Sequence, residues 1–236
     1  MKTLEKPFEG KPTLFHWHEI ETVFLDLDGT LLDRYFDDYF WNEYVPRVFA
    51  GKNNLDLETA RRQLLATYKS VENTLLWTDL DHWSAKLDLN IPMLKKEVSH
   101  LIAIHPGVID FLDHLTTLEK KIFLVTNAHP KTLDVKLDKV ALRGYFQAVF
   151  SSNDVGAPKE RQRFWKTLET LLPFAKETTF FADDTEKVLF SARKFGIHHL
   201  CHIARPSSRL APAFSDSFPS ITDFSQLTPS REDLQI

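Results

Sequence analysis

The sequence predicts an α/β fold: a parallel sheet with helices on both faces, and an all-helical segment inserted after the first strand. From Pro106 onward, short apolar runs alternate with segments of helical periodicity, a pattern typical of β-α-β units and a parallel sheet. Between residues 34 and 102, in contrast, apolar residues recur only at helical spacing. We therefore expect a core domain of residues 1–33 and 103–236 and a helical cap domain of residues 34–102.

The first strand is the apolar run that begins at Val23 and ends in two carboxylates, Asp26 and Asp28. Residues i and i+2 of a strand share a face, so both carboxylates are expected near its carboxyl end, unless the turn at Gly29 re-aims Asp28. Like charges repel, and burial of an unpaired carboxylate is expensive. The pair therefore indicates a bound cation or a reaction that uses both groups.

The elements after Pro106 follow this alternation in order. Strands are expected at residues 121–126, 147–151, 178–182 and 198–203, and helices at residues 108–118, 130–140, 160–172 and 185–195. Gly196 follows the last of these helices as its C′ residue. Residues 205–236 are rich in Ser and Pro and are expected to form a surface tail. One short helix within this tail is expected to pack through Ile221, Phe224 and Leu227.

The composition is that of an ordinary globular protein of 236 residues, of which 43% are apolar and 26% charged. The 29 basic and 33 acidic residues give a net charge of −4, which argues against nucleic acid as a partner. Cys201 is the single cysteine, so the chain has no internal disulfide and a cytoplasmic location is the default. Residues 1–19 lack the apolar region of a signal peptide, and no apolar run approaches the ~20 residues of a membrane span. We expect no membrane partner, and either a monomer or a homodimer.

Polar residues follow several predicted strands at their carboxyl ends, where open parallel sheets bind ligands. Thr126 and Asn127 end the second strand. Asp183 and Asp184 end the fourth, and Lys159 lies after the third. Each group has a plain structural alternative: Asp as a helix N-cap, Thr-Asn as a turn, and Lys as a solvated helix start. Their coincidence around one expected crevice favours a shared site over separate explanations.

These groups suit a phosphate ester and a divalent cation. Carboxylate oxygens and water are the ligands that Mg²⁺ prefers, and Mg²⁺ beside Lys159 would form a positive cradle for a phosphate dianion. Thr126 Oγ, Asn127 and the turn amides near Gly29 would supply further contacts to phosphate oxygens. One carboxylate is then free to act as a nucleophile and a second to transfer protons. The seven scattered glycines form neither a Walker A loop nor a G-x-G-x-x-G fingerprint, so the phosphate must be held by this other device.

The polar groups occur in the order and at the spacing of the four motifs of the haloacid dehalogenase (HAD) superfamily, which the chain resembles over essentially its whole length. The motif Asp26-x-Asp28-Gly29-Thr30 is specific in itself, and the four motifs together are very specific. The resemblance implies a Rossmann-like core with a helical cap and an aspartyl-phosphate intermediate. Asp26 would be the nucleophile and a Mg²⁺ ligand, and Asp28 the general acid/base, with its backbone carbonyl on the metal. Because a departing halide needs no proton, the dehalogenases lack this second carboxylate, and its presence argues for phosphoryl chemistry.

The remaining site residues follow from the same resemblance. Thr126 and Lys159 would bind phosphoryl oxygens, and Asp183 and Asp184 would be metal ligands. We favour Asp184 as a direct ligand, with Asp183 binding directly or through water. The family often has Gly-Asp-Ser or Glu-Asp-Ser here, whereas this chain has Asp183-Asp184-Thr185.

The cap is expected to select the substrate. Most of its aromatic side chains should form its own core, but its first helix starts beside the catalytic loop. We expect Tyr35, Phe36 and Asp37 to lie where they could meet the leaving group. Arg34 or Arg47 could reach a charge on the substrate, and a flat aromatic ring could stack a nucleobase.

At finer grain the chain resembles the GMP/IMP-type purine 5′-nucleotidases of this superfamily. The similar stretches are residues 36–41, 74–77 with 83–84, 126–130, and 158–160 with Gln162. The leading hypothesis is therefore a Mg²⁺-dependent phosphomonoesterase whose small-molecule substrate is a purine nucleoside 5′-monophosphate. The alternatives are a sugar-phosphate phosphatase or phosphomutase of the same superfamily and, from another class, a catalytically idle ligand-binding or interaction module.

Overall fold

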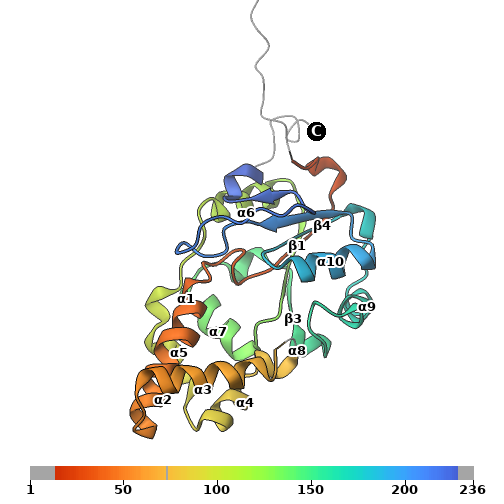
Figure 1. Ribbon diagram of the computed structural model, residues 1–236. Coiled ribbons are helices and arrows are strands. Elements are labelled where there is room, and N and C mark those ends of the chain that lie inside the picture. The colour runs from red at the N-terminus through yellow and green to blue at the C-terminus, as the bar shows by residue number, and fades with distance from the viewer. Residues whose placement is uncertain (1–13, 73, 228–236) are drawn as a thin grey trace, which may run out of the picture.

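A computed structural model of the chain describes residues 14–72 and 74–227; the predictions for the first residues and for the end of the tail lie outside these ranges. Its centre is a six-stranded sheet with the order β3-β2-β1-β4-β5-β6 (Figure 1). The strands, all parallel, are β1 (Thr22–Leu25), β2 (Lys121–Thr126), β3 (Ala148–Ser151), β4 (Thr179–Asp183), β5 (His199–Ile203) and β6 (Ser220–Ile221). Because β1 lies between β2 and β4, the carboxyl ends of β1 and β4 form the topological switch point, where such sheets bind ligands.

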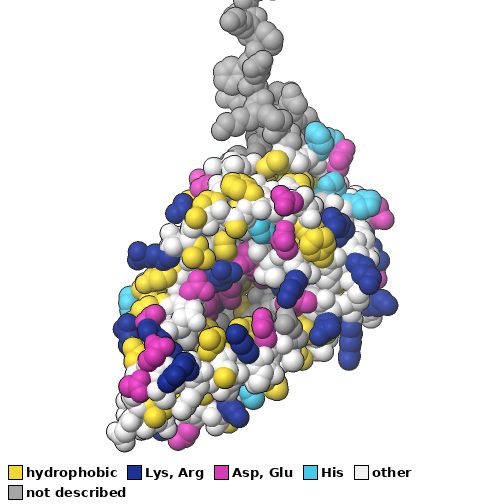
Figure 2. Space-filling model, viewed as in Figure 1, with side chains coloured by type: hydrophobic (Ala, Val, Ile, Leu, Met, Phe, Trp, Pro, Cys, Tyr) yellow, Lys and Arg dark blue, Asp and Glu magenta, His cyan; other side chains and the backbone are white. Residues whose placement is uncertain are grey.

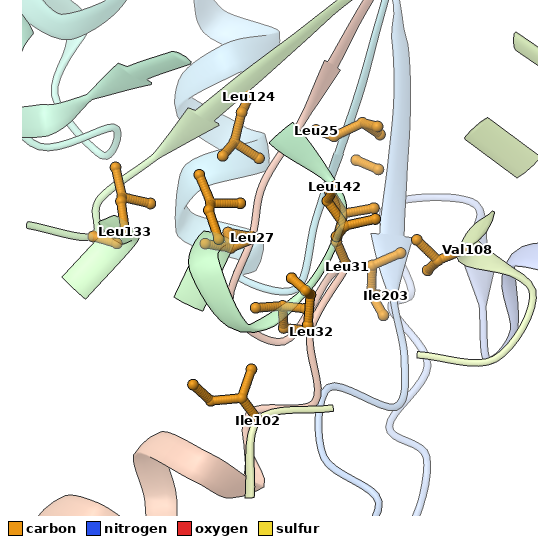
Figure 3. Close-up of a cluster of buried hydrophobic side chains, with 14 of the residues drawn as sticks. Leu25, Leu27, Leu31, Leu32, Ile102, Val108, Leu124, Leu133, Leu142 and Ile203 are labelled. Atoms are coloured by element: carbon orange, nitrogen blue, oxygen red, sulfur yellow. The ribbon is translucent and has the colours of Figure 1, made fainter. Parts of the chain in front are cut away.

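Helices cover both faces of the sheet, as the sequence predicts. The helices are α6 (Val108–Thr117) and α7 (Pro130–Lys139) on one face and α9 (Gln162–Leu171) and α10 (Glu186–Phe195) on the other. The two layers arise because neighbouring residues of a strand point to opposite faces. In β1, Val23 and Leu25 join the larger apolar cluster with α6 and α7, whereas Phe24 joins a second cluster with α9 and α10. Figure 3 shows Leu25 and Leu124, partners on adjacent strands, within the larger cluster.

The segment from Arg34 to Ile102 contains helices and no strand among its described residues, as the sequence predicts. Its elements are α1 (Tyr35–Tyr39), η2 (Phe40–Tyr44), α2 (Val45–Asn53), α3 (Leu57–Lys69), η3 (Leu75–Trp77), α4 (Leu80–Leu87), α5 (Ile91–Glu97) and η4 (Ser99–Leu101). Figure 1 shows α2, α3, α4 and α5 grouped at the lower left, away from the sheet, with α1 and α7 between this group and the strands.

The helical run that starts with α1 has an irregular turn in its middle. The element η2 is a π-helix, in which the N–H of Val45 donates to Phe40 O. Pro46, at the start of α2, has no N–H to offer the carbonyl of Asn42, as a regular α-helix would require. A π-turn accommodates such an interruption, and π-turns are frequent at functional sites.

The chain enters the helical segment after Asp33 and leaves it before Ala103, and these two connections lie side by side. The N–H of Asp33 donates to Ala103 O at 2.9 Å, and the N–H of His105 donates to Leu31 O at 2.9 Å. We propose that residues 34–102 form a separate domain, on the basis of these two paired connections.

Several details differ from the sequence prediction. Ile221, predicted in a short helix, forms the edge strand β6 by pairing with Ile203 of β5, and the helix is the 3-10 turn η7 (Phe224–Leu227). The helix predicted at residues 160–172 begins only at Gln162. The other short elements are η1 (Trp17–Glu19), η5 (Arg143–Tyr145), α8 (Ser152–Val155) and η6 (Lys176–Thr178). Within the described ranges, none of the helices combines the length and the apolar character that a membrane crossing needs.

Candidate active site

Asp26 stands at the carboxyl end of β1, at the switch point of the sheet. Its N–H donates to Ala182 O of β4 at 3.1 Å, which continues the parallel ladder one residue beyond the strand. This register brings Asp26 beside Asp183, the last residue of β4. Carboxylate oxygens of Asp26, Asp183 and Asp184 all lie within 4.8 Å of one another. The carboxylates that follow two separate strands thus form one cluster.

Lys159 is the counter-ion of this cluster. Its Nζ lies 2.5 Å from Asp26 Oδ1 and 2.6 Å from Asp183 Oδ2, and it also donates to Val125 O at 3.2 Å. The side chain is buried, with an exposed fraction of 3%. Burial alone would favour the neutral amine, but the charges of Asp183 and Asp26 raise the pKa of Lys159 above its ordinary value. Lys159 is therefore a fixed positive charge between two carboxylates.

Asn127 holds the loop that carries Lys159. Asn127 Oδ1 accepts the N–H of Lys159 at 3.0 Å, and its Nδ2 donates to Glu160 Oε2 at 3.1 Å. Thr126, at the end of β2, is buried, and its hydroxyl oxygen accepts the N–H of Ala128 at 3.0 Å. A hydroxyl that accepts in this way can still donate its hydrogen to an anion. The turn considered for Thr126-Asn127 is thus present, and it also positions Lys159.

Gly29 permits the close approach of Asp184. Its φ is 85°, in the left-handed region that favours glycine. A Cβ at this position would lie 2.5 Å from Asp184 Oδ2 and 3.0 Å from Pro206 Cβ. Only glycine lets the loop after β1 pass so near the carboxylate that follows β4.

Asp183 and Asp184 carry more negative charge than their neighbours neutralise. Asp184 Oδ2 accepts from Arg34 Nη1 at 2.8 Å, yet burial and the charge of Asp26 raise the pKa of Asp184 to about 6. Burial likewise raises the pKa of Asp183 well above its ordinary value, despite the charge of Lys159. These carboxylates fit Mg²⁺, because a divalent cation among their oxygens would remove the cost of ionising them.

Asp28 is paired with a lysine that the sequence analysis did not single out. Lys136 Nζ of α7 lies 2.5 Å from Asp28 Oδ1 and 2.5 Å from Asp37 Oδ2 of α1. Lys95 Nζ of α5 donates to Asp37 Oδ1 at 2.9 Å. Four charges of alternating sign thus run from the loop after β1 into the helical segment. The feature of the sequence that could have identified these lysines is their place on an apolar helix face. Lys136 is buried beside Leu137, and Lys95 is buried beside Leu94.

The pKa values of the two carboxyl groups in this line, Asp28 and Asp37, are shifted in opposite directions. Burial, with the charges of Asp37 and Asp26, raises the pKa of Asp28 to about 6, although Lys136 opposes this. Burial also acts to raise the pKa of Asp37, but Lys136 and Lys95 lower it to about 2. A carboxyl group with a pKa near neutrality suits proton exchange, whereas Asp37 stays a permanent anion.

A cavity of about 430 Å³ opens from Asp28 into the helical segment. The aromatic side chains in its lining are Trp41, Tyr68, Trp77 and Trp83. Trp83 is buried, whereas Trp77 is 42% exposed and Trp41 is half-buried, so Trp77 and Trp41 offer ring surface to a ligand. Figure 2 shows acidic side chains gathered in a hollow at the middle of this face of the molecule.

A second cavity, of about 510 Å³, lies over the strand ends. Its lining includes Asn127 and Asp184, and it shares Arg34 and Trp77 with the first cavity. The two cavities therefore adjoin, and together they extend from Asp184 of the carboxylate cluster to the aromatic rings.

Only two of the predicted substrate contacts in the helical segment line these cavities, Arg34 and Asp37. Phe36 is 1% exposed and packs in the larger apolar cluster. Tyr35 and Arg47 are absent from both linings, and Arg47 forms an ion pair with a glutamate one turn away. Two residues that were not predicted, Trp41 with its aromatic ring and Asn42 with its amide group, line the first cavity.

Residues 23–201 match the family described as haloacid dehalogenase-like hydrolase. The chain belongs to this family. The predicted α/β fold with a helical insertion and the predicted enzyme class, a hydrolase, are thereby confirmed for this HAD-like hydrolase.

Individual relatives of this HAD-like hydrolase cover nearly its whole length. The GMP/IMP nucleotidase YrfG of Escherichia coli (strain K12) is 36% identical over 214 residues, which are 91% of this chain and 96% of that protein. A HAD phosphatase from Thermococcus onnurineus superposes with a TM-score of 0.73 at 22% identity, over 92% of this chain and 98% of that one. A putative β-phosphoglucomutase from Thermotoga maritima superposes with a TM-score of 0.65 at 18% identity, over 88% and 97%. These two structures share the fold.

Proposed function

We propose that this hydrolase is a Mg²⁺-dependent phosphomonoesterase that hydrolyses purine nucleoside 5′-monophosphates through an aspartyl-phosphate. The observation that carries the proposal is the pair of adjoining cavities that extend from Asp184, past Arg34 and Trp77, to the aromatic rings. A phosphate at the strand ends would leave its alcohol facing those rings. The 36% identity to a protein named GMP/IMP nucleotidase supports the substrate class.

Asp26 is the proposed nucleophile, because Lys159 holds its carboxylate at the strand end. An Asp26 oxygen would bond to phosphorus as the bond from phosphorus to the 5′ oxygen breaks, and Asp28 would give its proton to that oxygen. Asp28 would then accept a proton from the water that cleaves the aspartyl-phosphate and releases inorganic phosphate. Lys159 and the Thr126 hydroxyl would contact the phosphoryl oxygens.

The carboxylates of Asp26 and Asp184 and the backbone carbonyl of Asp28 would hold Mg²⁺, with Asp183 binding directly or through water. The ion would supply charge neutralisation at the phosphoryl group. Lys159 already neutralises one negative charge in the cluster. The protein would hold the remaining carboxylates close enough for them to share one Mg²⁺ ion.

The test is phosphate release from GMP, IMP, CMP, UMP, glucose 6-phosphate and p-nitrophenyl phosphate, each with and without Mg²⁺. We expect kcat/KM for GMP and IMP to exceed that for the pyrimidine nucleotides by about tenfold or more, which corresponds to about 1.4 kcal/mol. A preference for pyrimidine nucleotides or glucose 6-phosphate would overturn the purine assignment. Phosphate returned to a sugar instead of water would favour a mutase, and inactivity on every ester would favour a binding module.

Trp77→Ala is expected to weaken nucleotide binding selectively. Stacking of a base on an aromatic ring contributes about 1–3 kcal/mol, so KM for GMP should rise by about tenfold while that for glycerol 2-phosphate, which has no ring to stack, changes little. Leu76→Ala is the matched control, since Leu76 is the neighbouring residue of η3, is 43% exposed, and lines neither cavity. Equal effects of the two substitutions on GMP would contradict a stacking role for Trp77.

Mg²⁺ is expected to raise the melting temperature more at pH 7.5 than at pH 5. The pKa values of Asp28 and Asp184 rise from 3.8 to about 6 on folding, so the folded protein binds more protons than the unfolded chain in this range. Without metal, the free energy of unfolding therefore decreases as the pH rises from about 4 through about 6. Mg²⁺ at about 100 times its Kd would add about 2.7 kcal/mol, or about 5–10 °C, at pH 7.5. Differential scanning fluorimetry checks this, and Asp184→Asn should lose most of the Mg²⁺ response.

A further inference from the structure

A buried lysine supports the carboxyl group that is proposed to exchange protons. Lys136 Nζ lies 2.5 Å from Asp28 Oδ1, and this oxygen is buried, although the Asp28 side chain as a whole is 26% exposed and lines the first cavity. The contact is an ion pair without the angles of an aligned hydrogen bond. Lys136 thus fixes one oxygen of the carboxyl group from the protein side and leaves the other for the cavity.

The helical segment holds Lys136 in turn. Lys136 Nζ lies 2.5 Å from Asp37 Oδ2 in α1, and Asp37 Oδ1 accepts from Lys95 Nζ of α5 at 2.9 Å. Both lysines are 1% exposed, and Lys95 Nζ lies 4.6 Å from the centre of the Phe40 ring. The line of charges therefore starts at the loop after β1, passes through α7, and ends on two helices of the segment inserted after that loop.

Fold stability gives no reason for this line of charges. Buried ion pairs seldom stabilise a protein more than apolar side chains of the same volume do. Lys136 and Lys95 lie on the buried faces of α7 and α5, where methionine or leucine would pack well. Charges that are held this firmly and end on a carboxylate at a cavity fit the positioning of a functional group.

We propose that Lys136 is a positioning residue for Asp28, and that Asp37 keeps Lys136 in place. The helical segment thereby orients the proton donor. The proposal rests on the proposed function, in which Asp28 protonates the departing oxygen. Lys136 acts through Asp28 and not on the substrate, because it lines neither cavity.

Lys136→Met tests the proposal through the leaving group. The ratio kcat/KM reports the steps up to the first irreversible one, which here is transfer of the phosphoryl group to Asp26. The 5′ oxygen of GMP needs a proton to depart, whereas p-nitrophenolate departs without one. Because general acid catalysis contributes about 10²–10⁴-fold, we expect kcat/KM to fall by about 10²-fold for GMP and by less than about threefold for p-nitrophenyl phosphate. The fall for GMP should lie in kcat, with KM almost unchanged.

Lys131→Met is the matched control. Lys131 also lies on α7 and also pairs with the helical segment, through Asp81 Oδ1 at 2.5 Å, but both side chains are at least half exposed. This variant should leave kcat/KM for both esters unchanged. Asp37→Asn is a second test that does not depend on the folding of Lys136→Met, since it retains both lysines and weakens the contacts of residue 37 with Lys136 and Lys95. It should lower the GMP value by a smaller factor and again spare p-nitrophenyl phosphate.

Equal losses for the two esters, or no loss, in variants that melt as cooperatively as the wild type would overturn the positioning role. The failure of the purine assignment would be visible separately, in the wild-type enzyme, as poor hydrolysis of GMP. In that case glycerol 2-phosphate replaces GMP as the alkyl ester, and the same comparison with p-nitrophenyl phosphate still tests Lys136.

Discussion

Asp26→Asn is expected to lower phosphate release from every ester that the wild-type enzyme hydrolyses by at least about 10⁴-fold. An amide is a poor nucleophile, and it also removes one negative charge from the proposed metal site. The substitution keeps the shape of a side chain that is 7% exposed, and the backbone hydrogen bond from residue 26 to Ala182 does not depend on the carboxylate. Initial rates with GMP and with p-nitrophenyl phosphate measure the loss.

Acid quenching distinguishes a lost nucleophile from a merely slowed enzyme. With 5′-[³²P]GMP, the wild-type protein should carry acid-stable label that hydroxylamine releases, as an acyl phosphate does, and Asp26→Asn should carry none. Asp138→Asn, at an exposed position of α7, is the control and should behave as the wild type. Hydrolysis of p-nitrophenyl phosphate by Asp26→Asn within about tenfold of the wild-type rate would contradict the assignment of the nucleophile.

Lys159→Met is expected to destabilise the metal-free protein by about 3–5 kcal/mol, because it leaves two buried carboxylates without their cation. For a chain of this length, that loss corresponds to a melting temperature lower by about 6–20 °C. Mg²⁺ should restore part of the loss, since it offers the same carboxylates another positive charge. Thermal unfolding of the variant with and without Mg²⁺ gives both numbers.

The position of the charge, and not the removal of a lysine as such, accounts for this expected effect. Lys131→Met breaks an ion pair with Asp81 in which both partners are at least half exposed, and it should cost no more than about 1 kcal/mol. A similar small shift for Lys159→Met would show that Asp26 and Asp183 do not depend on Lys159 for their charge balance.

The sequence was informative where function depends on strand ends. Asp26, Asp183 and Lys159 could be placed together from the alternation of elements alone, because parallel strands bring their carboxyl ends to one edge. The charge environment of each group was not predictable in this way. It depends on burial and on distances between segments up to 150 residues apart, as for Arg34 and Asp184.

The sequence predicted that the segment after the first strand is helical, but it did not predict which of its side chains line the cavities. Helical periodicity identifies a buried face, but it does not predict the π-turn at η2, and Trp41 and Asn42 within this turn line the cavity. Lys136 was overlooked because one lysine within an apolar face adds little to a periodicity. Its significance comes only from Asp28 and Asp37, which approach it from other elements.

The larger apolar cluster sets a limit on how the specificity of this enzyme could be exchanged. It is continuous from the sheet, through Leu25 and Leu124, to Phe40 and Trp83 of the helical segment. A chimera that receives the helical segment of another family member would have to accept a foreign half of this shared interior. Transplantation of the segment alone should therefore yield poorly packed proteins, and redesign of substrate choice is better confined to the few side chains that line the cavities, such as Trp77.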